Sequence, residues 1–248
     1  MKKLAFLTLL LSSVVSFGQI DLESILEGGT GDAQTLLKGY LSPFAKGFGN
    51  GINGGWYTTA KSHKFLGFDI SVIANGAMVP KSGETFTFNN ADYTNIKLDD
   101  SNLSSAELPT IFGSQKLADR PLLEFNDSNG GKIAVSSLPG SGLKEEINYN
   151  VVPSAMVQAG IGLFKKTDLI IRYVPKQSAD EYEFSTFGFG IKHDIKQWIP
   201  FVKKLPFDLS VIAAWNDIKS KFFFDVKNNP TQALEFNTKT TMFQLLAS

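Results

Sequence analysis

Apolar and polar residues alternate along several segments of the chain, most clearly over residues 151–164. There Val157, Ile161 and Leu163 share one face, while Ser154 and Gln158 share the other. A period of two is typical of β-strands, whose successive side chains point to opposite faces. The same period recurs over residues 51–60, 65–78, 168–175, 183–193, 207–215 and 238–248. The sequence therefore predicts an all-β chain, and the tight turn at 165–167 predicts an antiparallel hairpin.

The polar faces of these segments are rich in Gly, Ser and Asn, whereas the exposed face of a soluble strand usually carries Lys, Glu, Gln and Thr. An apolar outer face opposite a small, polar inner face is the sequence pattern of an outer-membrane antiparallel β-barrel. A secreted, soluble β-sandwich gives the same alternation and is the alternative fold. The charged residues on the polar faces are candidates for the barrel lumen: Asp69, Arg172, Lys192 and Asp208.

Substitutions should distinguish the two faces of such a barrel. Val157→Arg and Phe189→Arg should each cost about 2–4 kcal/mol near the bilayer centre, because they place a charge in lipid. Ser154→Arg and Gly190→Ser lie on the lumen face, so we expect them to cost far less.

Residues 19–50 have a helical period instead. Asp32 is suited to cap the helix, and Ser42-Pro43 predicts the end of a first helical stretch and the start of a second. We expect a short amphipathic helix that plugs a barrel mouth or lies on its outer rim; in the soluble alternative it packs against a sandwich. Following Ala33, the apolar residues at helical spacing are the plug candidates Leu36, Leu37, Tyr40, Leu41 and Phe44.

The first 18 residues have the pattern of a secretion signal. Lys2 and Lys3 precede an apolar run, and small residues precede a cleavage site near Gly18. The apolar run is too short to remain as a membrane anchor. The predicted organisation is thus a signal peptide (1–18), a helical plug (19–50) and a β-barrel domain (51–248).

Two regions of the predicted barrel domain lack a strong strand pattern. Residues 80–150 contain only weak strand candidates, at 85–88, 122–125 and 132–135, and we interpret them as a long loop over a barrel mouth or a small subdomain. Residues 194–206 form a basic amphipathic segment with Trp198, which is typical either of a membrane interface or of a short soluble helix on a sheet edge.

The count of strands is low for a closed barrel. About seven strands are clear, or about nine with the weak hairpin, which is at or below the lower end for closed barrels. The last alternating segment stops at Ser248 without the aromatic residue that usually ends bacterial barrels. We therefore expect a barrel that is incomplete at its C-terminus.

Composition excludes several classes of protein. Lys plus Arg equals Asp plus Glu at 24 each, so no net basic charge favours nucleic acid. The chain has no cysteine, which excludes both a lipoprotein anchor and a disulfide scaffold. Its 21 Phe and 22 Gly residues suit a lipid-facing surface and strands that pack closely around a curved sheet.

No recognised motif of catalysis or cofactor binding is present. The chain has neither a phosphate-binding loop nor a GxSxG turn, and Gly160 and Gly162 lie within a strand instead of opening a helix. Neither His63 nor His193 has a second metal ligand at helical spacing. We therefore expect no catalytic residue, no metal and no cofactor, and the chain is not predicted to be an enzyme.

Three phrases also carry a family resemblance: GNGINGGWYTTAKSHKFLGFDISV at 49–72, GLFKKTDLIIRYVP at 162–175 and GFGIKHDIKQWIPFVKKLPFDLSV at 188–211. They resemble an uncharacterised outer-membrane family of Bacteroidota, which is itself similar to long-chain fatty-acid transport channels. The resemblance covers nearly all of the mature chain, and members of the family extend further at the C-terminus. It implies a monomeric barrel with an N-terminal plug and an apolar ligand path.

The expected function is an outer-membrane channel for small hydrophobic compounds. Its expected partners are outer-membrane lipid and a small hydrophobic ligand, and no nucleic acid. The alternative is a secreted or surface-associated β-rich protein with a structural or adhesive role and no transport activity.

Overall fold

The chain divides into two compact units. The computed structural model describes residues 29–126, 130–179, 182–225 and 229–248, so the predicted signal peptide lies outside the described residues. The helix unit comprises the chain up to Phe48 together with Ala77–Pro153, and the sheet unit comprises Gly49–Gly76 together with Ser154–Ser248.

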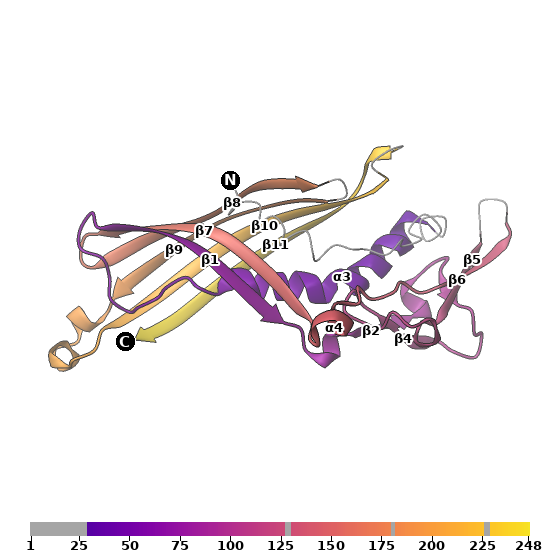
Figure 1. Ribbon diagram of the computed structural model, residues 1–248, viewed down its shortest axis with the longest axis horizontal. Coiled ribbons are helices and arrows are strands. Elements are labelled where there is room, and N and C mark those ends of the chain that lie inside the picture. Colours follow the sequence, from indigo (N-terminus) through magenta and orange to yellow (C-terminus); the bar gives the residue numbers. More distant parts are fainter. Residues whose placement is uncertain (1–28, 127–129, 180–181, 226–228) are drawn as a thin grey trace. The chain divides into compact units, whose positions relative to one another are not determined.

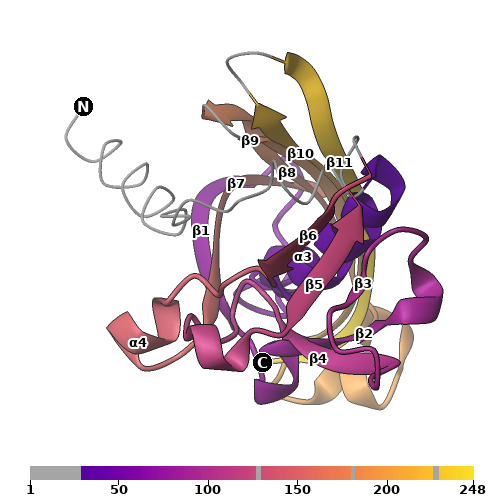
Figure 2. The same ribbon diagram turned by 90° about the vertical axis from the view of Figure 1, so that its right-hand side faces the viewer.

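The sheet unit is built on one six-stranded sheet with the strand order β1-β7-β8-β9-β10-β11 (Figure 1). Neighbouring strands from β7 to β11 pair antiparallel. The sheet curls into a half-barrel, with β1 and β11 as its two edges (Figure 2). This confirms the predicted β-rich fold, while closure into a barrel stays a prediction. The strands are β1 (Phe68–Met78), β7 (Val151–Leu163), β8 (Thr167–Ala179), β9 (Tyr182–Asp194), β10 (Leu209–Asp225) and β11 (Asn229–Ala247).

The two faces of this sheet have the polarity opposite to that of a soluble sheet. Along β7 the polar and small positions, including Ser154 and Gln158, are buried, while Val157 and Ile161 are exposed. The cross-strand register then places Val157, Tyr173 and Phe187 side by side on one exposed apolar face. The alternation in the sequence therefore assigned these residues to the correct faces. The exposed apolar face also includes Phe68, Ile70, Val72, Leu163, Ile171, Phe189, Ile191, Val211, Phe243 and Leu245.

One predicted strand is wrong. Residues 51–60 do not form a strand: the helix α3 (Thr30–Asn53) ends within them, and the rest is irregular up to β1. Gly54 and Gly55 follow the helix directly, and Gly55 has φ 71°, in the left-handed region that ends helices and disrupts strands. The apolar side chains buried here, Ile52, Trp56 and Ala60, are four residues apart, which is not the period of a strand.

Two other strands are longer than the sequence predicts. β10 has 17 residues and β11 has 19, because both continue well beyond the apolar alternation at 207–215 and 238–248. Charged residues occur in the described parts of these extensions. Lys219, Lys221 and Glu235 lie there, and Lys221 pairs with Glu235 across the two strands.

The helix unit has its own core, which the first part of α3 supplies together with residues 77–153. A Cβ on Gly39 would lie 2.5 Å from the ring of Phe86, so the helix approaches the strand β2 (Thr85–Asn89) closely. Tyr40 donates a hydrogen bond from its hydroxyl to the Pro139 carbonyl at 2.8 Å, and its own carbonyl accepts one from Ile111. The buried residues of this core include Leu36, Tyr40, Phe88, Ile96, Leu108, Leu123 and Phe125.

Residues 80–150 are accordingly a folded part of the helix unit. Two small antiparallel sheets pair β2 with β4, and β5 with both β3 and β6. Of these strands, the sequence predicts β2, β5 and β6 but neither β3 nor β4. The elements are β2 (Thr85–Asn89), β3 (Lys97–Leu98), β4 (Ser105–Pro109), β5 (Leu122–Asn126), β6 (Lys132–Ser136), the helix α4 (Leu143–Ile147) and the 3₁₀ turns Lys81–Gly83, Asn90–Asp92 and Leu117–Asp119.

Three local predictions about helices are corrected by the structure. α3 continues through Pro43 as one helix of 24 residues, so Ser42-Pro43 does not divide it. Asp32 does not cap this helix; its carboxylate instead accepts hydrogen bonds from the backbone N–H groups of Thr94, Asn95 and Ile96. Residues 194–206 form only two 3₁₀ turns, η4 (Lys196–Trp198) and η5 (Val202–Lys204), on either side of Pro200. Of the described helices, none combines the length and the apolar character needed to cross a membrane.

Candidate functional site

A single irregular segment covers the polar face of the sheet and forms the centre of the candidate site. We call residues 49–67 the inner segment; it includes the last turn of α3 and the chain that leads to β1. Every strand of the sheet holds it by hydrogen bonds. The donors and acceptors on the sheet are Asn75 (β1), Gly162 (β7), Asp168 and Arg172 (β8), Lys192 (β9), Ser210 and Asn216 (β10) and Thr240 (β11).

Four charged or titratable side chains, including His63 of the inner segment itself, form a continuous row of contacts between this segment and the sheet. Lys192 Nζ lies 3.1 Å from Asp168 Oδ2, and both side chains are almost completely buried. The same Asp168 oxygen lies 3.1 Å from His63 Nδ1, and His63 Nε2 lies 3.4 Å from Asp69 Oδ1. Lys192 also donates to the carbonyl oxygens of Thr59 and Lys61. Burial of a charge costs free energy unless the charge is paired. These contacts therefore hold the inner segment against β8 and β9.

Trp56 is the main apolar contact between the inner segment and the sheet. Its side chain is fully buried, and the Arg172 guanidinium lies 3.8 Å from the ring centroid, within cation–π distance. Arg172 is held in this position by its hydrogen bonds to Gln158 and to the Ile52 carbonyl. Trp56 packs in a cluster with Ala60, Ile170, Ile212, Ala214, Met242 and Leu246.

Glycines on β9 make room for these contacts. The register aligns Gly190 with Ile170 and Ala214, and a Cβ on Gly190 would lie 2.9 Å from the Trp56 ring. A Cβ on Gly188 would lie 2.3 Å from Asn216 Oδ1. Gly190→Ser is therefore not a mild change, contrary to the expectation from the sequence. Ser154→Arg is not mild either, because Ser154 is buried.

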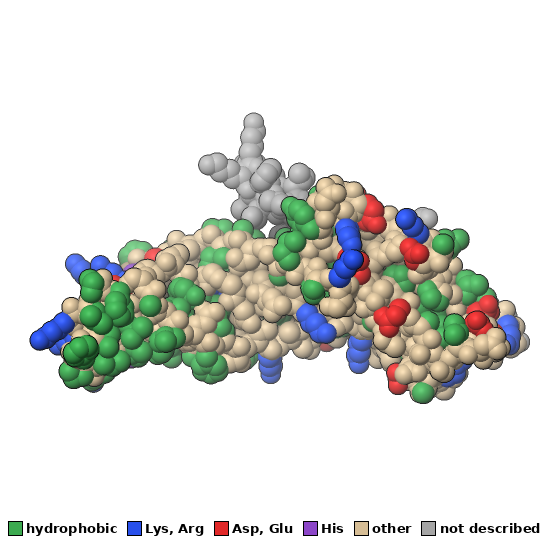
Figure 3. All heavy atoms as spheres, turned by 90° about the horizontal axis from the view of Figure 1, so that it is seen from below, with side chains coloured by type: hydrophobic (Ala, Val, Ile, Leu, Met, Phe, Trp, Pro, Cys, Tyr) green, Lys and Arg blue, Asp and Glu red, His purple; other side chains and the backbone are tan. Residues whose placement is uncertain are grey.

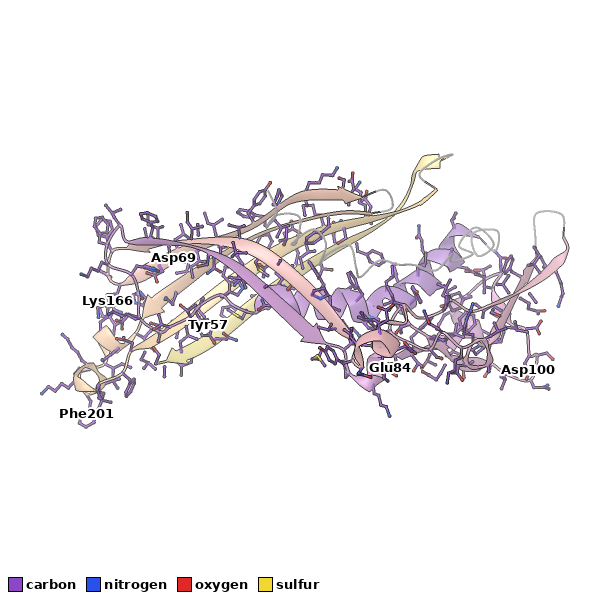
Figure 4. The ribbon with its side chains drawn as sticks, viewed as in Figure 1. Tyr57, Asp69, Glu84, Asp100, Lys166 and Phe201 are labelled. Carbon is purple, nitrogen blue, oxygen red and sulfur yellow. The ribbon has the colours of Figure 1, made fainter. Side chains whose placement is uncertain are left out.

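A cavity of about 500 Å³ lies between the inner segment and the strands β1, β7, β8 and β9. Its wall combines the aromatic side chains of Trp56 and Tyr57 with the charged groups of Asp69, Asp168 and Lys192. Figure 4 labels Tyr57 on the inner segment and Asp69 near the beginning of β1. Ligand sites are typically concave and mixed in this way, with an apolar wall and a few placed polar groups.

The structure brings three of the four predicted lumen residues into this site. Arg172 and Lys192 lie on the polar face under the inner segment, and Asp69 reaches Lys192 through His63 and Asp168. Asp208 lies apart from them, just before β10, where its backbone exchanges two hydrogen bonds with Ser248.

The predicted plug residues lie in α3. Leu36, Leu37, Tyr40 and Leu41 are buried, while Phe44 is half-buried and stacks on Phe48. Tyr40 forms hydrogen bonds with Ile111 and Pro139 of the helix unit. A plug function for this helix stays a prediction, and the segment that covers the polar face of the sheet is the inner segment.

Sequence reasoning missed His63, Asp168 and Trp56 as parts of one site. From the sequence, His63 is considered only as a metal ligand that lacks a second ligand, and residues 51–60 are predicted to form a strand. The available signal was Gly188 and Gly190, since two small residues on one strand face indicate that another part of the chain approaches closely.

Comparison with known proteins assigns the chain to a family. A model of the family DUF6588 matches residues 1–248. The chain belongs to DUF6588, a family of unknown function. Among curated proteins and among solved structures, no significant match is found. Membership of DUF6588 agrees with the resemblance to an uncharacterised family.

Proposed function

We propose that this member of DUF6588 is an outer-membrane β-barrel protein that forms a channel for small compounds. One observation carries the proposal: the sheet exposes its large apolar side chains and buries its polar ones. Phe68, for example, is 74 % exposed, whereas Arg172 is fully buried. In water, such a broad exposed apolar face is unfavourable by roughly 25 cal/mol per Å². In a bilayer, the same face is the one that lipid requires.

The polar face supports the second half of the proposal. The inside of an outer-membrane barrel is polar and is often closed by a segment of the same chain. The inner segment lies against the polar face of the sheet, as such a closing segment would. Each of the six strands forms at least one hydrogen bond with it. The cavity beside it is the proposed compartment for the transported compound.

The proposed cargo is a small compound with a hydrophobic part. Trp56, Ile73 and Ile170 supply an apolar wall of the cavity, and Asp69 and Lys192 supply charge at its polar side. The proposal also includes the resemblance to an outer-membrane family of Bacteroidota and, through it, to long-chain fatty-acid transport channels. It further includes export through the signal peptide at 1–18, a monomeric barrel and the absence of enzymatic activity.

Cell fractionation tests the location. The full chain, expressed with its own N-terminus in a Gram-negative host, should remain in the outer-membrane fraction after washing with alkaline carbonate. Its mobility on SDS gels should change on boiling if the sheet closes into a barrel. Recovery of all folded protein from the soluble periplasmic or secreted fraction would instead favour the β-rich structural or adhesive alternative.

Uptake of dyes tests the cargo independently of the location. Outer membranes that contain the protein should admit a small hydrophobic dye faster than membranes without it. A hydrophilic dye of similar size is the matched control and should enter equally with and without the protein. If the protein is found in the outer membrane but changes neither uptake rate, the proposed location stands and the proposed channel function is wrong.

A further inference from the structure

One end of the sheet is formed by three loops that contact one another. They comprise residues 61–67 before β1, 164–166 between β7 and β8, and 195–208 between β9 and β10. The rings of Phe65 and Phe164 stack with centroids 4.4 Å apart, and the Gln197 side chain donates a hydrogen bond to the Lys165 carbonyl at 2.8 Å. We call these three loops the basic end; Lys166 and Phe201 mark it in Figure 4.

The basic end exposes several large apolar side chains. Phe201 is 85 % exposed, and Phe164 and Trp198 are also largely exposed. Figure 3 shows hydrophobic side chains gathered at this end, with lysines at its tip. The exposed apolar residues of the three loops are Phe65, Leu66, Phe164, Trp198, Ile199, Phe201, Leu205 and Phe207.

The charge at this end is predominantly positive. The three loops contain no Glu, and their one Asp is Asp208, which is half-buried where 195–208 meets β10. Of the neighbouring strand residues, Asp168 and Asp194 are buried and paired with Lys192 and Lys166, and the partly exposed Asp69 lies 3.4 Å from His63. Lysines, by contrast, occur throughout: Lys61, Lys64, Lys165, Lys166, Lys196, Lys203 and Lys204.

Further along the sheet the charges are mixed. Lys176 pairs with Glu183, and Lys221 pairs with Glu235. The basic character therefore belongs to one end, and it borders directly on the exposed apolar face through Phe68 of β1 and Leu163 of β7.

We propose that the basic end lies at the membrane surface and binds the anionic phosphate groups of lipid headgroups. Aromatic side chains and lysines are the residues that proteins place at the level of the headgroups, where rings contact both apolar and polar layers and ammonium groups contact phosphate. The inference rests on the proposed membrane location and adds its orientation and lipid preference. A second copy of the chain is disfavoured as the occupant, because it would oppose lysines with lysines.

The depth of two tryptophans tests the position of this end. Trp198 lies in the basic end, and Trp215 lies on the exposed face of β10 beside Phe189. The full-length protein is reconstituted in vesicles whose lipids carry bromine either near the headgroup or near the end of the acyl chain. The variants Trp198→Phe and Trp215→Phe identify the contribution of each tryptophan to the quenched fluorescence. Bromine near the headgroup (shallow bromine) should quench the fluorescence of Trp198. Bromine near the end of the acyl chain (deep bromine) should quench that of Trp215.

The outcomes of this measurement separate the two proposals. If deep bromine quenches Trp215 while neither bromine quenches Trp198, the membrane location stands and the basic end does not lie at the headgroups. If deep bromine leaves Trp215 unquenched, the proposed membrane location itself fails.

Charge substitutions test the lipid partner. Insertion at low salt should be faster into phosphatidylcholine vesicles that contain phosphatidylglycerol than into phosphatidylcholine alone, by about tenfold or more for several lysines. The combined variant Lys64→Gln, Lys165→Gln, Lys203→Gln and Lys204→Gln should lose most of this preference. The matched control changes the net charge equally at exposed lysines elsewhere, with Lys81→Gln, Lys116→Gln, Lys219→Gln and Lys239→Gln. An equal preference in both variants would overturn the assignment of the basic end.

Discussion

Lys192 and Asp168 form a cross-strand ion pair of 3.1 Å beneath the inner segment. They are direct partners in the register of β8 and β9, and Lys192 also donates to two carbonyl oxygens of the inner segment. One ammonium group therefore neutralises a buried carboxylate and holds the covering segment to the sheet.

Removal of this ammonium group should loosen the inner segment. Lys192→Met leaves Asp168 buried without its cation, which should cost about 3–5 kcal/mol. Hydrogen exchange of the His63 amide, which donates to Asp168 Oδ1, should become faster. Lys219→Met, at an exposed lysine of β10, is the control and should leave exchange unchanged. Unchanged exchange in Lys192→Met would mean that the pair does not hold the segment.

Addition of one methyl group under Trp56 should displace its ring. A Cβ at position 190 would lie 2.9 Å from that ring, so Gly190→Ala should cost about 1–3 kcal/mol. The expected signal is a red shift of Trp56 fluorescence as the buried indole moves. In the double variant Gly190→Ala, Trp56→Leu, the added methyl group should cost much less free energy of unfolding, because leucine is smaller than tryptophan and leaves space for it. A fully native spectrum for Gly190→Ala would contradict the close packing.

A charged substitution on the exposed apolar face should destabilise the protein only if that face contacts lipid. Val157 and Leu103 have the same exposed fraction, 46 %, on the sheet and in the helix unit respectively. In reconstituted protein, Val157→Arg should cost about 2–4 kcal/mol near the bilayer centre, whereas Leu103→Arg should be close to neutral. Unfolding by denaturant measures both. If both substitutions are neutral, water and not lipid covers the sheet.

Asp32 should stabilise the helix unit in a pH-dependent way. Burial opposes its charge, but the N–H groups of Thr94, Ile96 and Asn95, together with Lys97, outweigh that effect and hold the pKa below 3.8. Because the folded pKa is lowered, this stabilisation is complete above about pH 4 and is lost as the pH falls through the folded value. Asp32→Asn should therefore cost about 2–3 kcal/mol at neutral pH and progressively less in acid.

Hydrogen exchange of the amides at 94–96 and denaturant unfolding between neutral and acid pH measure this difference. Asp100→Asn is the control, since Asp100 is exposed and, among the contacts described, its carboxylate accepts hydrogen bonds only from Asn102 of its own turn. A cost for Asp32→Asn that stays constant down to the lowest pH would show that the charge of Asp32 is not responsible.

How far prediction from sequence succeeded depends on the range of the interaction. Strands β7, β8 and β9 are predicted within a few residues, because alternation is visible in each strand alone. The inner segment is predicted wrongly, because its conformation depends on groups such as Asp168 and Ser210, which lie more than a hundred residues away. Asp32 fails as a cap for the same reason: its partners begin at Thr94.

The sequence by itself determined which residues share a face, because the two faces of a strand follow from a period of two in the chain. That partition placed Arg172 and Lys192 together and Val157 and Phe189 opposite them. Only the tertiary structure decided which segment covers the polar face and which groups pair there. Those contacts join residues far apart in the chain, and their energy depends on burial and distance, neither of which is a property of the local sequence.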